Sequence, residues 1–225
     1  MIFGYKIIRF VTKLLFVVLI LASASKSRKN ILKNSGIDFI QISSSFDEAS
    51  VQETNVSKLA LKLSCSKAYA VLTKVSNDYD SHGFLDNSVE IIGCDSIFKF
   101  NGELFGKPTS KKEAFDRWQR MSGGLGNLYT GHTLLFCESK KDSKNFSIKT
   151  IVKEVVVSKI YFAKLTDLEI ENYVNSLEPL QCAGGFALEG RGGKFIEKID
   201  GCFSNVMGLS LPWLRKELLK KDIYA

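Results

Sequence analysis

Histidine is scarce in this chain of 225 residues, since only His82 and His132 occur and they lie far apart in the sequence. The five cysteines are also widely spaced, and the sequence contains no C-x-x-C pair. Zinc sites and disulfide frameworks are usually built from clustered Cys and His, so neither is indicated. An odd number of isolated cysteines instead favours buried, reduced thiols and a cytoplasmic protein.

The sequence lacks an apolar run long enough to cross a membrane. Its most apolar stretch, residues 14–22, falls well short of the roughly 20 residues that a spanning helix needs. Lys6, Arg9 and Lys13 precede this stretch and small residues follow it, which is also the pattern of a secretory signal peptide. A buried parallel strand that leads into a phosphate-binding turn has the same appearance, so the pattern alone leaves both interpretations open.

The formal net charge of +7 is not concentrated in any one segment. A nucleic-acid-binding protein typically carries Lys and Arg along one helix face, interleaved with aromatic residues, and no such helix is predicted here. Stable binding to nucleic acid is therefore not expected. A small polyanionic ligand, such as a nucleoside triphosphate held by a few Lys and Arg side chains, would use the same charge locally.

Strand and helix patterns alternate in the first half of the chain, and β-hairpin patterns follow. Buried strands are predicted over residues 17–22 and 89–94, with a second short strand over 37–43. Residues 55–73 have the apolar spacing of an amphipathic helix, and a capping box predicts another helix over 110–121. This order predicts an α/β protein with a mixed, strongly bent central sheet flanked by helices.

Three local features have the chemistry of a phosphate site. Ser23-x-Ser25-x-x-Arg28 follows the first strand, where hydroxyls, backbone N–H groups and a guanidinium can hold phosphate. Asp95 closes the second buried strand, a position suited to Mg²⁺ or to an attacking water, and Lys107 stands between Gly and Pro. Each feature also has an ordinary interpretation: a capped turn, a hairpin residue and a solvated lysine. P-loop and Rossmann motifs are absent from the sequence.

Several longer segments, taken in order, resemble one family. LILASASKSRKNILKNSGIDF, IIGCDSIFKFNGELFGKP, MSGGLGNLYTGH and EPLQCAGGFALEGRGGKFIEKIDGCFSNVMGLSLP are similar to the Maf proteins, which are nucleoside triphosphate pyrophosphatases of an ITPase-like fold. The resemblance implies two lobes around a nucleotide cleft and a single domain over residues 17–225. Residues 1–16 have no counterpart in the family pattern. They are either a genuine N-terminal extension or the result of a start codon assigned too far upstream.

The resemblance also implies an activity, which is hydrolysis of a nucleoside triphosphate to its monophosphate and pyrophosphate with Mg²⁺ or Mn²⁺. By match, Asp95 is the proton acceptor and a metal ligand, and Glu48 contacts the metal or the attacking water. The residues that match the family's triphosphate contacts are Ser23, Ser25, Arg28, Lys67 and Lys107. We expect strands 17–22 and 89–94 to bring Ser23, Ser25, Arg28 and Asp95 into one cleft, with Lys67 pointing into it.

Base recognition is expected at Ser27, Ser96 and Glu189. The family branch that acts on dTTP and UTP tends to have Arg, Thr and Gln at these positions, whereas the branch that acts on 7-methyl-GTP tends to have Glu where Glu189 stands. Ser96 is closer to the first branch and Glu189 to the second, so the preferred base stays open. A modified or non-standard nucleotide is a further candidate substrate.

Two alternatives compete with a cytoplasmic, membrane-free enzyme. Maf proteins are also associated with restraint of cell division, so the chain is alternatively a nucleotide-binding regulator with little turnover. A secreted or membrane-tethered binding protein would use residues 1–24 as its address. Cleavage after Ala24 would remove the phosphate-binding turn, which favours the strand interpretation of this segment. The family resemblance further implies a homodimer.

Overall fold

The computed structural model describes residues 17–77, 88–140 and 145–224. Its strands are β1 (Val17–Leu21), β2 (Ile40–Gln41), β3 (Ser88–Phe100), β4 (Glu103–Phe105), β5 (Leu125–Lys140), β6 (Asn145–Phe162) and β7 (Ile196–Asp200). Its α-helices are α1 (Lys26–Asn34), α2 (Val56–Asn77), α3 (Lys111–Met121), α4 (Asp167–Asn175), α5 (Phe203–Val206) and α6 (Leu211–Tyr224). Short 3-10 helices are η1 (Glu48–Ser50), η3 (Glu178–Gln181), η4 (Ala183–Gly185) and η5 (Arg191–Phe195).

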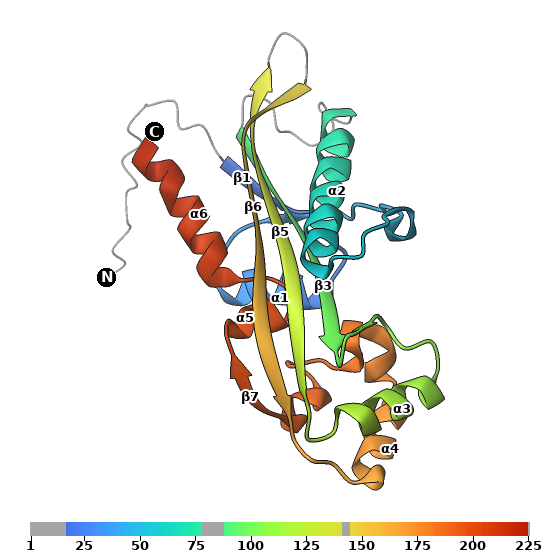
Figure 1. Ribbon diagram of the computed structural model, residues 1–225. Helices are drawn as coiled ribbons and strands as arrows, with labels where there is room; N and C mark the ends of the chain where they lie inside the picture. Colours follow the sequence, from blue (N-terminus) through green and yellow to red (C-terminus); the bar gives the residue numbers. More distant parts are fainter. Residues whose placement is uncertain (1–16, 78–87, 141–144, 225) are drawn as a thin grey trace, which may run out of the picture.

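All seven strands belong to one mixed sheet, in the order β2-β1-β3-β5-β6-β7, with β4 paired to the far end of β3. β1 runs parallel to β2 and β3, and the other pairs are antiparallel. The long strands β5 and β6 run through both halves of the molecule (Figure 1). The predicted mixed α/β sheet is confirmed. The strand predicted over residues 37–43 is shorter than expected, since only β2 forms there. The extension 1–16 lies outside the described residues.

Helices cover both faces of the sheet (Figure 1). Side chains alternate between the two faces along a strand. In β3, Ile91 therefore packs with Ala68 and Val71 of α2 in one core cluster. Ile92 and Cys94 point the other way, into a second cluster formed with α1 and α6. The near-continuous apolar sequence of this strand follows from its burial on both faces.

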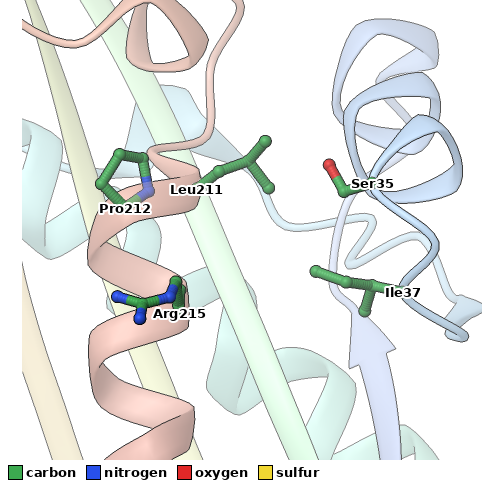
Figure 2. A pocket seen from close by; sticks show the side chains of 5 residues that line it. All are labelled: Ser35, Ile37, Leu211, Pro212 and Arg215. Atoms are coloured by element: carbon green, nitrogen blue, oxygen red, sulfur yellow. The ribbon is translucent and has the colours of Figure 1, made fainter.

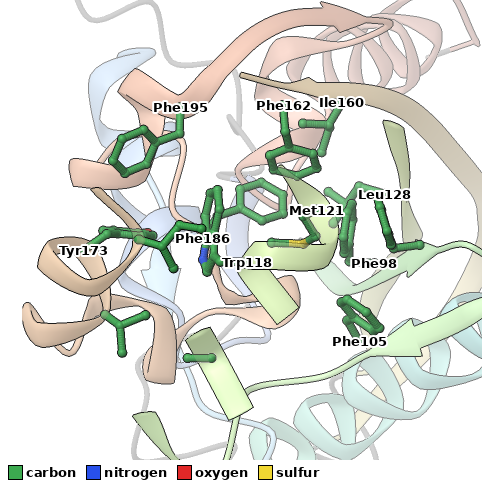
Figure 3. Packing of buried hydrophobic residues seen from close by; sticks show 14 of the residues in the cluster. Phe98, Phe105, Trp118, Met121, Leu128, Ile160, Phe162, Tyr173, Phe186 and Phe195 are labelled. Carbon is green, nitrogen blue, oxygen red and sulfur yellow. The ribbon is translucent and has the colours of Figure 1, made fainter. Parts of the chain in front are cut away.

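An aromatic cluster fills the lobe formed by the far ends of β3, β5 and β6 (Figure 3). Trp118 of α3 lies at its centre and makes edge contacts with Phe162, Tyr173 and Phe195. Its indole Nε1 donates a 2.9 Å hydrogen bond to the carbonyl of Gly185. Burial of one such aromatic side chain stabilises the fold by about 1.5–3 kcal/mol. The cluster therefore fixes the glycine-rich 3-10 helix η4.

The edge of β3 that faces β1 contains a gap. β1 pairs with β3 only as far as Ile92, and β4 pairs with it only from Phe98 onward. On the opposite edge, β5 pairs with β3 continuously from Val89 to Phe100. The prediction that the strand ends at Asp95 is therefore wrong, because β5 holds it extended well beyond this residue. What ends before Asp95 is the parallel pairing with β1.

Helix α2 lies unusually close to the backbone of the sheet. A Cβ atom added at Gly131 of β5 would overlap the carbonyl oxygen of Ala60, and one added at Gly93 of β3 would overlap that of Ser64. Both oxygens belong to α2. Glycine is therefore needed at both strand positions because the helix backbone occupies the space of a side chain.

We expect Gly131→Ala to destabilise the protein by at least about 1–3 kcal/mol, because the added methyl group meets helix backbone that has no room to move. Gly106→Ala is the matched control, since a Cβ at Gly106 would have no atom within 4 Å. Chemical denaturation of both variants measures the difference. Equal stability of the two variants would contradict the close packing of α2.

All five cysteines are free thiols in the structure, but only Cys94 and Cys137 are buried, whereas the sequence led us to expect burial of all five. None of the helices in the described ranges is both long and apolar enough to cross a membrane.

Candidate functional site

The turn after β1 is built by hydroxyl groups. Ser25 is the N-cap of α1, and its Oγ accepts a 3.4 Å hydrogen bond from the backbone N–H of Arg28. The Oγ of Ser23 accepts from the N–H of Ser25 at 3.2 Å. From β2, the side-chain amide of Gln41 donates to the carbonyl of Ser23 at 2.8 Å. Local capping and one long-range contact together fix the turn at the end of the strand.

The Arg28 guanidinium is buried and held in one orientation. Its Nη1 donates to the Ser23 Oγ at 3.2 Å, and its Nη2 donates to the Ser96 Oγ at 3.1 Å. The Nε donates to the carbonyl of Gly208 at 2.8 Å. A guanidinium has five N–H donors, so three are committed to the protein and two are left. Those two give Arg28 the capacity to bind an anion without leaving its position.

A second charged group stands beside the gap in β3. Lys67 projects from α2, and its Nζ lies 2.5 Å from the Asp95 Oδ1 and 2.7 Å from the Glu48 Oε1. Lys67 and Asp95 are buried, whereas Glu48 is more than half exposed. The structure thus joins three of the predicted site residues through one ammonium group.

Burial raises the pKa of Asp95 above its ordinary value, although Lys67 and Arg28 both act to lower it. Removal of water disfavours the charged carboxylate, and the two nearby cations only partly offset this cost. A carboxylate with a raised pKa is a stronger base than an ordinary Asp. This property favours Asp95 as a proton acceptor.

The residues that were expected to share one cleft are divided between the two faces of β3. Asp95 and Ser96 are consecutive in β3, so their side chains point to opposite faces. Asp95 meets Lys67 on the α2 face, whereas Ser96 meets Arg28 on the other face. Arg28 still acts electrostatically on the Asp95 carboxyl. The two groups therefore converge on the same unpaired stretch of β3 from its two sides.

Lys107 and Glu189 belong to the aromatic lobe. Both are exposed, and both act on the pKa of Cys182, which burial raises to about 11. Among the described residues, neither forms a hydrogen bond or ion pair with Arg28, Lys67 or Asp95, and the side chain of the half-buried Ser27 forms none with them either.

The segment that carries Glu189 is organised by Glu178. The carboxylate of Glu178 accepts hydrogen bonds from the Tyr173 hydroxyl at 2.7 Å, the Arg191 N–H at 2.9 Å and the Gly192 N–H at 3.0 Å. Burial raises its pKa, but these hydrogen bonds outweigh burial and the net pKa is lowered. Glu178 therefore stays charged and clamps the loop next to Glu189.

Sequence reasoning missed Gln41, Glu178 and Gly208. Gln41 and Gly208 act on residues that are distant in the chain, and nothing in their local sequence indicates such a partner. The only hint in the sequence is that position 208 is a glycine. The structure gives Gly208 a φ of 102°, which other residues rarely adopt.

The two carboxylates beside Lys67 fit a magnesium-type site. Mg²⁺ is usually held by one or two carboxylates together with substrate phosphates, and Glu48 and Asp95 are two such carboxylates, both paired here with the Lys67 ammonium. Within the described ranges, no cluster of three or more His, Cys, Asp or Glu suits a metal. Any metal at this position would therefore need ligands from the substrate.

A separate cavity of about 480 Å³ lies between the end of α1 and the start of α6 (Figure 2). The residues that line it are Ser35, Ile37, Leu211, Pro212 and Arg215. None of them belongs to the charged groups described above. The lining of the cavity is largely apolar, and Arg215 is the only charged residue in it.

The sequence of the chain matches a known protein family. The family model described as Maf-like protein matches residues 18–221 and so includes the turn, the gap and the aromatic lobe. The chain belongs to the Maf family. Membership explains why the motifs along the chain occur in their observed order.

Relatives within the family share most of this chain. A "Nucleoside triphosphate pyrophosphatase" of Prochlorococcus marinus (strain MIT 9215) is 57% identical over 203 residues, which cover 90% of this chain and 100% of that protein. The protein of the same name from strain MIT 9301 is 56% identical over the same shares. That of Synechococcus sp. (strain CC9605) is 44% identical over 198 residues, or 88% of this chain and 100% of the relative.

We expect the pKa of Asp95 in metal-free protein to lie above the ordinary Asp value of about 3.9. Lys67→Gln should raise it further, because the substitution removes a nearby positive charge that favours the carboxylate. Carboxyl titration by NMR measures both values. Lys62→Gln on the same helix is the control, since Lys62 pairs with Glu53 instead. An unchanged Asp95 titration in Lys67→Gln would contradict the coupling.

Proposed function

We propose that this Maf protein is a nucleoside triphosphate pyrophosphatase, which hydrolyses its substrate to the monophosphate and pyrophosphate. The main support is the convergence of the Arg28 turn and the Lys67–Asp95 pair on the unpaired stretch of β3. The names of the relatives agree with this activity. The proposal extends to this chain an activity that those names state for other proteins.

The phosphate chain would be held by cations from both faces of β3. Arg28 has two free N–H donors for phosphate oxygens, and Ser23 and Ser25 form the turn beside it. Lys67 is the counter-charge on the α2 face. Lys107 belongs to the aromatic lobe and would reach the far end of the triphosphate. Fixed cations of this kind stabilise the negative charge that develops on the leaving pyrophosphate.

Asp95 would accept the proton of the water that attacks the α-phosphorus. Its raised pKa favours this role, and the hydrogen bond from Lys67 fixes the position of its carboxyl. Glu48, which is exposed and bonded to the same ammonium, would help to position that water. A divalent cation such as Mg²⁺ or Mn²⁺, held by Asp95 and Glu48, would neutralise charge on the phosphates.

Base selection would fall to Glu189 and Ser27, with Ser96 as the third candidate from the sequence. An ionised Glu accepts hydrogen bonds and cannot donate them, so Glu189 would suit the N–H donors of a guanine-type edge. Because Glu189 is exposed on a loop, a modified or non-standard base would also find room there. We place the enzyme in the cytoplasm, where its five free thiols stay reduced.

Asp95→Asn should lower kcat by about 10²–10⁴-fold for pyrophosphate release, because the amide cannot accept the proton. The assay uses purified protein with Mg²⁺ or Mn²⁺ and dTTP, UTP, CTP, GTP and 7-methyl-GTP. Asp116→Asn is the control, since Asp116 is an exposed residue of α3 that pairs with Lys112. Wild-type turnover in the Asp95→Asn variant would exclude Asp95 as the base.

The alternative of a regulator with little turnover gives a different result in the same experiment. Such a protein would bind nucleotide without releasing pyrophosphate, and the Asp95→Asn variant would bind as well as the wild type.

We expect Glu189→Gln to change the ranking of nucleotides, because an amide both donates and accepts hydrogen bonds. A substrate with a pyrimidine carbonyl should gain relative to a guanine-type substrate. The ratios of kcat/KM across the same panel measure this shift. Glu197→Gln, on β7, is the matched exposed control. A loss that is equal for every base would instead assign Glu189 a role outside base recognition.

A further inference from the structure

The hydrogen bonds around Ser96 point to a role other than base recognition. Its Oγ accepts from the Arg28 Nη2 at 3.1 Å and lies 3.0 Å from the Oγ1 of Thr130, its cross-strand partner in β5. Thr130 is fully buried, and its Oγ1 also lies 3.2 Å from the carbonyl oxygen of Asn205. Ser96 is thus the link between a charged group and a buried chain of hydroxyls.

The direction of each hydrogen bond in this chain is fixed. A hydroxyl has one proton, and the carbonyl of Asn205 can only accept, so the Thr130 proton goes to Asn205. Thr130 must then accept from Ser96, and the Ser96 proton is used as well. The free lone pairs of Ser96 remain as an acceptor for Arg28. Hydrogen bonds aligned in one direction polarise one another, so donation to Thr130 makes the Ser96 hydroxyl a stronger acceptor for Arg28.

The same C-terminal segment holds Arg28 from a second side. The carbonyl of Gly208 accepts from the Arg28 Nε, and a Cβ at Gly208 would lie 3.0 Å from that nitrogen and 3.4 Å from the Ser96 Oγ. Two residues further, the N–H of Ser210 donates to the Nε2 of His132 in β5 at 2.9 Å. Burial lowers the pKa of His132 to about 3, so the imidazole stays neutral and keeps its acceptor. The segment is therefore anchored to the sheet on both sides of Gly208.

We propose that Ser96 is a positioning residue for Arg28, which it fixes through the Thr130–Asn205 hydrogen-bond chain so that two guanidinium N–H groups face the triphosphate. This inference rests on the proposed function, because it assumes that Arg28 binds the triphosphate. It predicts a contribution of Ser96 that is the same for every base. A base-reading Ser96 would instead act on some nucleotides and not on others.

Inorganic tripolyphosphate separates the two roles, because it has the phosphate chain and no base. We expect Ser96→Ala to weaken tripolyphosphate binding by about tenfold, the loss typical of a hydrogen bond to a charged group. The KM values of all nucleotides in the panel should rise by a similar factor, with their ranking unchanged. Isothermal titration calorimetry measures the binding without requiring turnover. Ser96→Thr keeps the hydroxyl and should restore binding.

Two further variants test whether Ser96 acts through Arg28. In an Arg28→Lys background, Ser96→Ala should cause no additional loss, because the guanidinium contact is already gone. Ser64→Ala is the matched control, since Ser64 is also a buried serine paired with a threonine of β5, Thr133, and has no contact with Arg28. It should bind tripolyphosphate like the wild type. Thermal unfolding checks that both serine variants are folded.

Three results would overturn the inference. They are an altered base ranking with unchanged tripolyphosphate binding, a loss that persists in the Arg28→Lys background, and a wild-type protein that does not bind tripolyphosphate. If tripolyphosphate binds and depends on Ser96, but no nucleotide is hydrolysed, the proposed function fails and the positioning role stands.

Discussion

The contact between α2 and the sheet is the constraint on which the site depends. Because Gly93 and Gly131 lack side chains, the helix backbone rests directly on β3 and β5. Lys67 is thereby carried to the level of Asp95 and buried there. A buried ammonium is costly unless it is paired, so the close packing requires the carboxylates of Asp95 and Glu48 beside it. The close packing of α2 and the placement of these charges therefore depend on each other.

The two faces of β3 carry different parts of the proposed chemistry. Asp95, the proposed proton acceptor, and its partner Lys67 lie on the α2 face. Arg28 lies on the α1 face, where it is held by Ser23, Ser96 and Gly208. Both groups are backed by rigid strands and helices, which hold reacting groups more accurately than loops do. The unpaired edge of β3 between them is the place where a phosphate chain would contact both groups at once.

Local structure could be predicted well from the sequence, whereas contacts between residues far apart in the chain could not. The strand before Ser23 and the capped helix that begins after Ser110 follow from local chemistry, and both form. The length of β3 could not be predicted, because its pairing with β5 depends on residues far along the chain. The same applies to Arg28, whose acceptor Gly208 lies 180 residues away. The family resemblance indicated the candidate site residues, but it did not indicate on which face of the sheet each one lies.

Phosphate binding and base selection would rest on separate supports in this molecule. Arg28, Lys67 and Asp95 are buried at the centre of the sheet, where a substitution disturbs packing and charge together. Glu189 is exposed on a segment that depends on Glu178 and on the aromatic lobe. Loop residues tolerate change far better than core residues do. If Glu189 reads the base and Asp95 accepts the proton, as proposed, a substitution at position 189 would change base preference and leave Asp95 undisturbed.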